Sequence, residues 1–256
     1  MAAPSIDDHA LAHHLATRAG EMLVLLRAQM VADRATTKEM RDEGDARSHR
    51  MLMDALAEER PHDAVLSEES EDESTAARQA RSQRSRVWIV DPLDGTREYG
   101  EVPRTDWAVH VALAIDGRPV VGAVALPAVG TTLSTVAPTT LRAHPSSPPR
   151  VVVSRSRPPA EALAVATAIE AELVEMGSAG AKAMAVVRGE VDVYPHSGGQ
   201  YEWDSCAPVA VALAAGLWCS RLDGEELVYN RPDPYLPDLV ICRQELAPAV
   251  LEAVRG

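Results

Sequence analysis

Apolar residues near the start of the chain recur four or seven positions apart, a spacing that places them on one face of an α-helix. They are Leu11, Leu15, Met22 and Leu26. The pattern predicts a long helix from Ser5 to about Met30, with Ser5 as its N-cap. Apolar residues return at helical spacing after Asp45, so a second helix is predicted to follow that residue.

After Pro61, short apolar runs bounded by polar residues replace the helical pattern, and such runs are typical of strands. The predicted strands are 64–66, 87–90, 107–115, 120–126 and 131–136. The third and fourth are joined by Asp116-Gly117, a dipeptide that favours a tight hairpin turn. The polar stretch from Ser70 to Arg86 is predicted to be a surface loop.

Proline and serine accumulate from Ala143 to Pro149, which marks the clearest internal boundary. We therefore expect a single domain, 1–256, with lobes 1–142 and 150–256. The second lobe is predicted to hold a strand at 151–153, helices at 159–175 and 181–187, a strand at 191–194, a helix at 204–215, and a closing strand and helix. Because helices and strands interleave, the sequence favours a layered α/β fold.

Composition narrows the class of protein. Phe is absent and 46% of residues are apolar, so the core must rest on Ala, Val and Leu. The net charge of −13 argues against nucleic acid or an anionic membrane as a partner. The longest apolar run, Cys206 to Cys219, is too short to span a bilayer.

The cysteines and the first residues bear on the compartment. Cys206, Cys219 and Cys242 lack metal-ligand spacing and cannot all pair, which favours free thiols in a reducing cytoplasm. Asp7 and Asp8 stand where an export signal would carry positive charge. We therefore expect a soluble, cytoplasmic protein.

The string Asp91-Pro92-Leu93-Asp94-Gly95-Thr96 directly follows the predicted strand 87–90. Asp-Pro and Asp-Gly are common in turns, so a plain turn is the simplest interpretation. However, α/β proteins build sites at strand ends, and two carboxylates held close together repel unless a cation lies between them. The string could offer Mg²⁺ two carboxylates, a carbonyl and a hydroxyl, which are the oxygen ligands it prefers.

Two further strings place acidic residues at the ends of predicted elements. Glu68-Glu69 follows the strand 64–66, where a solvated acidic loop is the alternative interpretation. Trp203-Asp204 opens the helix 204–215, where Asp204 could serve only as an N-cap. One such string could arise by coincidence, but three in one chain are much harder to explain in that way.

In their order and spacing, the three strings resemble those of the inositol monophosphatase superfamily of lithium-sensitive, Mg²⁺-dependent phosphatases. The resemblance extends from about Asp45 to the end of the chain. It implies an α/β fold of the layered αβαβα sandwich type. It also implies a first lobe with the metal-binding strings and a second lobe that binds substrate and supplies Asp204.

The resemblance implies two or three Mg²⁺ ions and a set of ligands for them. One ion would be held by Glu68, Asp91 and the carbonyl of Leu93. A second would be held by Asp91, Asp94 and Asp204. Metal ions screen the phosphate and activate water, so the chemistry fits a phosphate monoester as substrate.

The resemblance also implies catalytic residues. Asp45 matches the aspartate that pairs with Thr96 to orient and deprotonate the attacking water, and Glu68 is a further catalytic carboxylate. Gly95 and Thr96 would begin a helix whose backbone N–H groups meet the phosphate. One departure is the stretch 38–45, which is shorter than in the family, so a role for Lys38 is left open and the stretch could be a mobile loop.

Within the superfamily, several features favour the CysQ-type branch, whose members act on 3′-phosphoadenosine 5′-phosphate. The stretches 154–156 and 177–182 resemble segments that this branch places against the nucleotide. Inositol enzymes carry a glutamate seven residues before the aspartate aligned with Asp204, and here that residue is Ser197. The expected substrate-binding residues are Gly95, Thr96, Ser154, Arg155, Ser178, Lys182 and Asp204.

The expected partner is therefore a small phosphate ester, either an adenosine bisphosphate or a sugar phosphate, in a reaction that serves sulfate assimilation. Two alternatives stay open. One is a broader phosphatase of inositol phosphates or fructose 1,6-bisphosphate, and the other is a catalytically silent sensor that binds Mg²⁺ and a nucleotide. Thr96 argues against the sensor, because binding alone needs no water-activating group. A homodimer is also open, since the superfamily is often dimeric.

Overall fold

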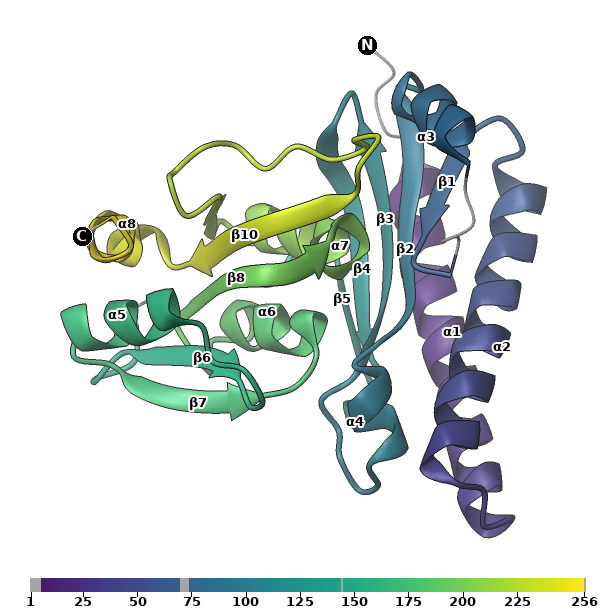
Figure 1. Cartoon of the computed structure of the whole chain (residues 1–256), viewed down its shortest axis with the longest axis horizontal. Coiled ribbons are helices and arrows are strands. Elements are labelled where there is room, and N and C mark those ends of the chain that lie inside the picture. The colour runs from purple at the N-terminus through teal and green to yellow at the C-terminus, as the bar shows by residue number, and fades with distance from the viewer. Residues whose placement is uncertain (1–5, 70–73, 144, 256) are drawn as a thin grey trace.

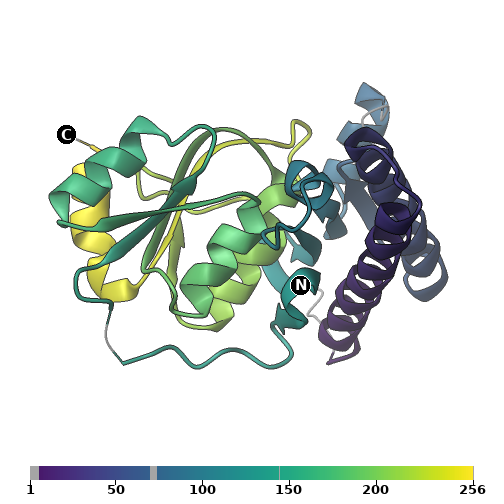
Figure 2. The same cartoon turned by 90° about the horizontal axis from the view of Figure 1, so that it is seen from below.

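Five layers of secondary structure alternate between helices and sheets, which confirms the predicted αβαβα sandwich (Figure 1). The computed structural model describes residues 6–69, 74–143 and 145–255, so the predicted cap Ser5 lies outside the described residues. The outer helix layer consists of α1 (Ile6–Ala32) and α2 (Thr37–Glu59). The central layer consists of α6 (Ala179–Val187) and α7 (Glu202–Ala214). The layer on the far side consists of α5 (Ala160–Ala168) and α8 (Ala247–Ala253). Figure 2 shows α6 and α7 side by side between the two sheets.

The first sheet carries one parallel pair and is otherwise antiparallel. Its strands, in spatial order, are β1 (Ala64–Ser67), β2 (Arg86–Asp94), β3 (Ala108–Ile115), β4 (Arg118–Leu126) and β5 (Thr131–Ser134). The predicted hairpin is confirmed, with Asp116 and Gly117 at φ values of 49° and 78°. Positive φ at both residues matches the twist of the strands they join.

The second sheet has five strands, of which the sequence predicted three. Its spatial order is β7 (Glu172–Met176), β6 (Arg150–Ser154), β8 (Val193–Tyr201), β10 (Tyr235–Cys242) and β9 (Trp218–Ser220). The predicted helix 159–175 is wrong beyond Ala168, because Glu170 at φ 50° ends the helical path and β7 follows. Most residues of this edge strand are exposed, so its sequence does not show the alternation of apolar and polar residues that is typical of a strand.

Other predicted boundaries are wrong as well, including that of the strand 191–194, which continues as β8 to Tyr201. The stretch 38–45 is helical, because α2 begins at Thr37 behind a capping box in which Thr36 and Glu39 exchange hydrogen bonds. The predicted loop 70–86 contains α3 (Thr75–Ser82), capped by Ser74, while 70–73 lie outside the described residues. The remaining short helices are α4 (Thr96–Gly100) and the 3₁₀ turns Pro127–Val129 and Gln244–Leu246.

The core consists mainly of Ala, Val and Leu, as composition predicts, and it fills the spaces between all five layers. The largest buried side chains, Trp88, Tyr99 and Trp107, lie between the first sheet and the outer helices. Within the described ranges, no helix is both long and apolar enough to cross a bilayer. The first sheet and the central helices α6 and α7 therefore form a packed frame, and the predicted metal ligands lie where they meet.

Candidate active site

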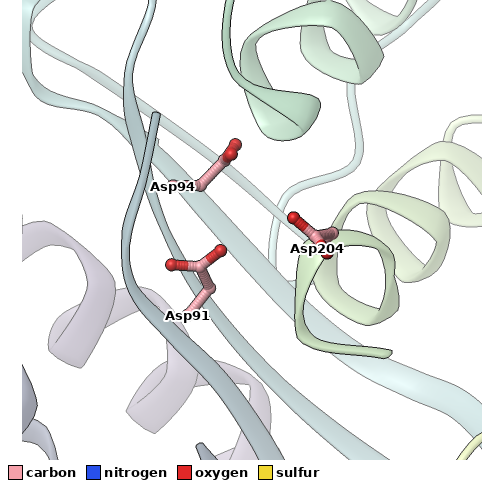
Figure 3. A group of neighbouring side chains, drawn as sticks. All are labelled: Asp91, Asp94 and Asp204. Atoms are coloured by element: carbon pink, nitrogen blue, oxygen red, sulfur yellow. The ribbon is translucent and has the colours of Figure 1, made fainter. Parts of the chain in front are cut away.

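A β-bulge in β2 turns two predicted metal ligands toward the same side of the first sheet. Asp91 pairs with His110 of β3 and Asp94 pairs with Ala108, so three steps along β2 match two along β3. Residues three apart in a regular strand point to opposite faces, and the extra residue of a bulge corrects this. Both carboxylates consequently point toward the same space (Figure 3).

Buried hydrogen bonds hold the bulge in place. The hydroxyl of Ser48, from α2, donates to the carbonyl of Pro92 at 2.6 Å. The N–H of Leu93 donates to Oδ1 of Asp91 at 3.0 Å, and Pro92 has no N–H to leave unpaired. The backbone groups that the bulge removes from the ladder are thereby satisfied, so its shape is well determined.

Asp204 reaches the same point from the first turn of α7. Its Oδ2 accepts a hydrogen bond from the N–H of Tyr201 at 2.7 Å, so it also caps that helix. One carboxylate oxygen from each of Asp91, Asp94 and Asp204 lies within 4.8 Å of the others, and Figure 3 shows the three groups facing one another. The structure therefore brings these three predicted residues together, and their role as metal ligands stays a prediction.

Asp94 is held by the start of α6. Its Oδ1 accepts from the N–H of Ala179 at 3.0 Å, and its Oδ2 accepts from the N–H of Gly180 at 2.6 Å and from the hydroxyl of Ser178. The positive end of the helix dipole adds to these bonds. Because a carboxylate oxygen has about two lone pairs, Oδ1 can still bind a cation.

The carboxylates differ in their affinity for protons. Burial and repulsion by Glu68 and Asp94 raise the pKa of Asp91 well above its ordinary value. Burial and Asp94 raise the pKa of Asp204 to about 7. Burial alone would raise the pKa of Asp94 as well, but contacts with His110 and Ser178 outweigh it and lower this pKa to about 2.

These opposed shifts show that the donor set suits a divalent cation. Burial and repulsion by neighbouring carboxylates favour the protonated forms of Asp91 and Asp204, and the N–H of Tyr201 with the charges of His110 and Lys182 only partly offsets this for Asp204, whereas Asp94 favours its ionised form. A divalent cation removes that repulsion and finds the oxygen ligands that Mg²⁺ prefers. The residues present therefore fit the metal that the sequence predicts.

Glu68 and Asp45 extend the acidic site. Burial and repulsion from Asp204 and Asp45 raise the pKa of Glu68 to about 8. Burial and repulsion from Glu69 raise the pKa of Asp45 to about 7, and this residue lies inside α2. Both carboxylates thus interact with their acidic neighbours, while a metal-binding role for Glu68 and a water-activating role for Asp45 stay predictions.

The turn at Gly95 and Thr96 is closely packed. Gly95 has φ 80°, and a Cβ there would lie 3.0 Å from the Cβ of Ser178 and 3.2 Å from the carbonyl of Asp106, so only glycine fits. The Thr96 hydroxyl donates to the carbonyl of Leu93 at 3.0 Å. The predicted pairing of Thr96 with Asp45 and the predicted metal contact of the Leu93 carbonyl are not tested by these contacts.

The two predicted substrate cations already have partners. The ammonium of Lys182 is buried, donates to the carbonyls of Gly177 and Ser178 at 3.3 and 2.5 Å, and lies 5.4 Å from the centre of the Tyr194 ring. Nε of Arg155 donates to Glu98, and its Nη2 donates to Glu101, each at 2.7 Å.

The remaining predicted residues lie at the surface. Ser154 is half-buried, and its Oγ is 3.4 Å from that of Ser156, close to Arg155 on the same loop. Lys38 is exposed and forms an ion pair with Asp42 one helical turn away. The structure therefore does not bring Lys38 to the acidic cluster.

One residue of the site, His110, was missed by sequence reasoning. It is fully buried on β3, and its ring approaches both Asp91 and Asp94. The run 107–115 reads as an alternating strand, and a histidine within it reads as part of the core. The signal that could have found it is its position on the strand that follows the acidic string.

Comparisons with known proteins agree with this geometry. The sequence profile of the inositol monophosphatase family matches residues 8–255. A Mycobacterium leprae protein named 3′-phosphoadenosine 5′-phosphate phosphatase is 47% identical, over 98% of this chain and 94% of its own. The Escherichia coli protein named 3′(2′),5′-bisphosphate nucleotidase CysQ is 31% identical, over 75% of this chain and 80% of its own. An inositol monophosphatase structure from Zymomonas mobilis superposes with a TM-score of 0.77 at 20% identity, covering 100% of both chains.

Proposed function

The chain belongs to the inositol monophosphatase family, and from this premise we propose that it is a Mg²⁺-dependent phosphomonoesterase acting on 3′-phosphoadenosine 5′-phosphate. Hydrolysis of the 3′-phosphate would yield AMP and inorganic phosphate. The names of the relatives support this substrate, because the 47% and 31% identical proteins are both named for nucleotide phosphate hydrolysis. The proposal includes inhibition by Li⁺ and a cytoplasmic reaction that serves sulfate assimilation.

The observation that carries the proposal is the carboxylate cluster. Asp91, Asp94 and Asp204 offer oxygens within 4.8 Å of one another, from two elements far apart in sequence. The bonds from α6 favour the ionised form of Asp94, and a bound cation would displace the protons that the raised pKa values of Asp91 and Asp204 favour. Glu68 and the carbonyl of Leu93 would complete the ligand set for two or three ions.

The chain's own residues would direct in-line hydrolysis. Bound Mg²⁺ lowers the pKa of coordinated water and screens the phosphate charge. Asp45 and Thr96 would orient the attacking water and take its proton, and the N–H groups of Gly95 and Thr96 would hold the phosphate. The water oxygen bonds to phosphorus as the bond from phosphorus to the ribose 3′-oxygen breaks, and that oxygen then takes up a proton.

On the substrate side, we propose that Ser154, Arg155, Ser178 and Lys182 bind the nucleotide. The 5′-phosphate does not react, so its binding energy can orient the 3′-phosphate. The 5′-phosphate would accept from N–H groups of Lys182 or Arg155 that the present bonds leave unused, since an ammonium has three donors and a guanidinium five, or it would exchange with the present acceptors of these side chains. Such exchanges would make substrate binding compete with contacts that the protein already makes.

Phosphate release from a substrate panel tests the proposal. The panel holds 3′-phosphoadenosine 5′-phosphate, inositol 1-phosphate and fructose 1,6-bisphosphate, each with Mg²⁺ and with a chelator. We expect fastest release from the nucleotide, none with the chelator, and inhibition by Li⁺. Faster release from a sugar phosphate would favour the broader phosphatase, whereas nucleotide binding without release would favour the sensor.

A further inference from the structure

His110 lies at the centre of the acidic cluster, although it belongs to none of the acidic strings. It sits directly opposite Asp91 across β2 and β3, and side chains of opposite residues lie on the same face of a sheet. Its side chain is fully buried, in a position where ionisable residues are rare unless they are paired. Burial alone would lower the pKa of this histidine, but the contact with Asp94 outweighs burial and raises it.

The ring contacts both elements that carry the carboxylates, β2 and α7. Its Nδ1 lies 3.0 Å from the carbonyl of Trp203, and because a carbonyl can only accept, Nδ1 is the donor. Its Nε2 lies 3.2 Å from Oδ2 of Asp94, and its Nδ1 lies 4.0 Å from Oδ2 of Asp91. The first contact supports the residue before Asp204, so one side chain bears on the placement of every ligand in the cluster.

The approach of Nε2 to Asp94 is close in distance but poorly aligned for a hydrogen bond. Nε2 is fully buried, and within the described structure it has no other hydrogen-bond partner. A buried polar atom without a partner costs free energy, and the interaction of Nε2 with the carboxylate of Asp94 is what offsets that cost. Asp94 is therefore the group toward which the second ring nitrogen acts.

Gly180 makes room for this contact. A Cβ at position 180 would lie 2.0 Å from Nε2 of His110, so any larger residue would displace the ring. The same glycine donates its N–H to Oδ2 of Asp94 at 2.6 Å. The start of α6 is thus shaped to admit the imidazole edge beside the carboxylate.

We propose that His110 is a positioning residue that holds Asp94, through Nε2, in the orientation needed to bind a divalent cation. Partners behind a metal ligand fix its orientation, and their loss typically weakens metal binding about 10–100-fold. The inference rests on the proposed metal-dependent function but concerns a residue outside the ligand set. It assigns the two ring nitrogens different tasks, since Nδ1 supports the start of α7 and Nε2 supports Asp94.

Two substitutions separate the ring nitrogens. In His110→Asn the amide nitrogen can replace Nδ1, and in His110→Gln it can replace Nε2. The probe is Mn²⁺ alone, measured by isothermal titration calorimetry on the full chain without substrate. We expect His110→Asn to weaken binding about tenfold or more and His110→Gln to stay within about threefold of the original protein. Equal affinity in the two variants, whether retained or lost, would overturn the assignment to Nε2.

Gly180→Ala supplies a second test that leaves His110 in place. The added methyl group should displace the ring and weaken Mn²⁺ binding, and this effect should vanish in the His110→Asn background, because coupled residues are not additive. Gly20→Ala, on the outer helix α1, is the matched control. Its Cβ would also be crowded, 2.6 Å from Pro127, but this substitution should leave Mn²⁺ affinity unchanged. Additive effects of Gly180→Ala and His110→Asn would contradict the proposal.

The calorimetry also separates failure of this inference from failure of the proposed function. If the original chain does not bind Mn²⁺, the metal-dependent function itself is wrong. If the original chain binds Mn²⁺ and both His110→Asn and Gly180→Ala bind it equally well, the positioning role is wrong while the proposed function stands.

Discussion

At the residue scale, neighbouring carboxylates of one cluster have opposite electrostatic situations. Asp94 accepts three hydrogen bonds from the start of α6, which favour its ionised form, whereas burial and neighbouring acids raise the pKa of Asp91 well above its ordinary value. The two residues are therefore not equivalent in the metal-free protein, although both are expected to bind metal. Substitution by asparagine should separate their contributions to stability from their shared contribution to catalysis.

We expect both Asp91→Asn and Asp94→Asn to abolish turnover, but to change metal-free stability in opposite directions. An amide resembles the protonated acid that Asp91 already favours, so Asp91→Asn should retain or increase the free energy of unfolding. Asp94→Asn sets an amide against three donors and should lose about 1–3 kcal/mol. Urea denaturation with a chelator measures both values, and equal destabilisation of the two variants would contradict the electrostatic account.

Lys182 offers a residue-scale test of substrate choice. Lys182→Met removes the charge but keeps most of the side-chain volume. We expect kcat/KM for 3′-phosphoadenosine 5′-phosphate to fall about tenfold or more, the scale of one lost charge-assisted contact, with a much smaller loss for inositol 1-phosphate. The matched variant Lys38→Met, at an exposed position, should leave both values unchanged. Equal losses on both substrates would show that Lys182 serves only the fold.

The ligands and the missed residue differ in how far sequence reveals them. The meeting of Asp91, Asp94 and Asp204 could be predicted because each follows or opens a predicted element, where a carboxylate has no role in the core. The place of His110 in the site could not be predicted, because strand periodicity shows which face of the sheet a residue occupies but not which residue of the neighbouring strand lies beside it. The pairing of β2 with β3 across a bulge decides that contact.

At the element scale, the bulge in β2 depends on a contact from another layer. Ser48 lies in the middle of α2 and donates to the carbonyl of Pro92, so the outer helix layer supports the metal-binding strand. The sequence predicted the strand 87–90 but not its continuation to Asp94, since the string of acids, Pro and Gly reads as a turn. The hydrogen bond from α2 and the pairing with β3 stabilise a strand conformation that the local sequence does not favour.

Ser48→Ala should therefore destabilise the protein and slow the reaction. We expect a loss of about 1–3 kcal/mol in the free energy of unfolding, because a buried carbonyl loses its donor, and a reduced kcat. Thr167→Ala is the control, since this hydroxyl also donates to a backbone carbonyl but is exposed, and its effect should be within about 0.5 kcal/mol. Denaturation and steady-state kinetics of the two variants provide the comparison, and similar behaviour would exclude a special role for Ser48.

Element boundaries were less predictable than element types. The start of α2 was missed because its first turns are almost wholly polar and carry no apolar stripe, although the Thr36–Glu39 capping box is visible in the sequence. The strand β7 was merged with α5 because both contain apolar residues within one short window. The pairing of β7 with β6 determines where that strand lies, and the capping box determines where α2 begins, so apolar periodicity alone finds neither boundary.

At the scale of the whole molecule, the candidate metal site lies between layers contributed by both halves of the chain. The first sheet supplies Asp91 and Asp94, and the central helices supply Asp204 and the donors to Asp94. Binding a cation should therefore hold the first sheet and the central helix layer together. The stability of the protein should depend on metal and pH together.

The direction of the pH dependence follows from the raised pKa values. Glu68 and Asp204, with pKa values of about 8 and 7, bind protons more tightly in the folded state than in the unfolded state. Their contribution to stability is fully present below their unfolded pKa values and is lost as pH rises through the folded values. We expect the metal-free Tm to fall between about pH 5 and pH 8, and Mg²⁺ to restore it at the higher pH. Calorimetric scans with chelator and with Mg²⁺ test this, and a metal-free Tm that rises over the same range would contradict the proposed charge states.

The central claim is that the acidic cluster hydrolyses the 3′-phosphate of a nucleotide with the help of Mg²⁺. The most direct test is kcat/KM for 3′-phosphoadenosine 5′-phosphate and for inositol 1-phosphate, measured on the same preparation with Mg²⁺. The account predicts a larger value for the nucleotide, with AMP and phosphate formed in equal amounts and no turnover in Asp94→Asn. A larger value for inositol 1-phosphate, or nucleotide turnover that persists in Asp94→Asn, would contradict it.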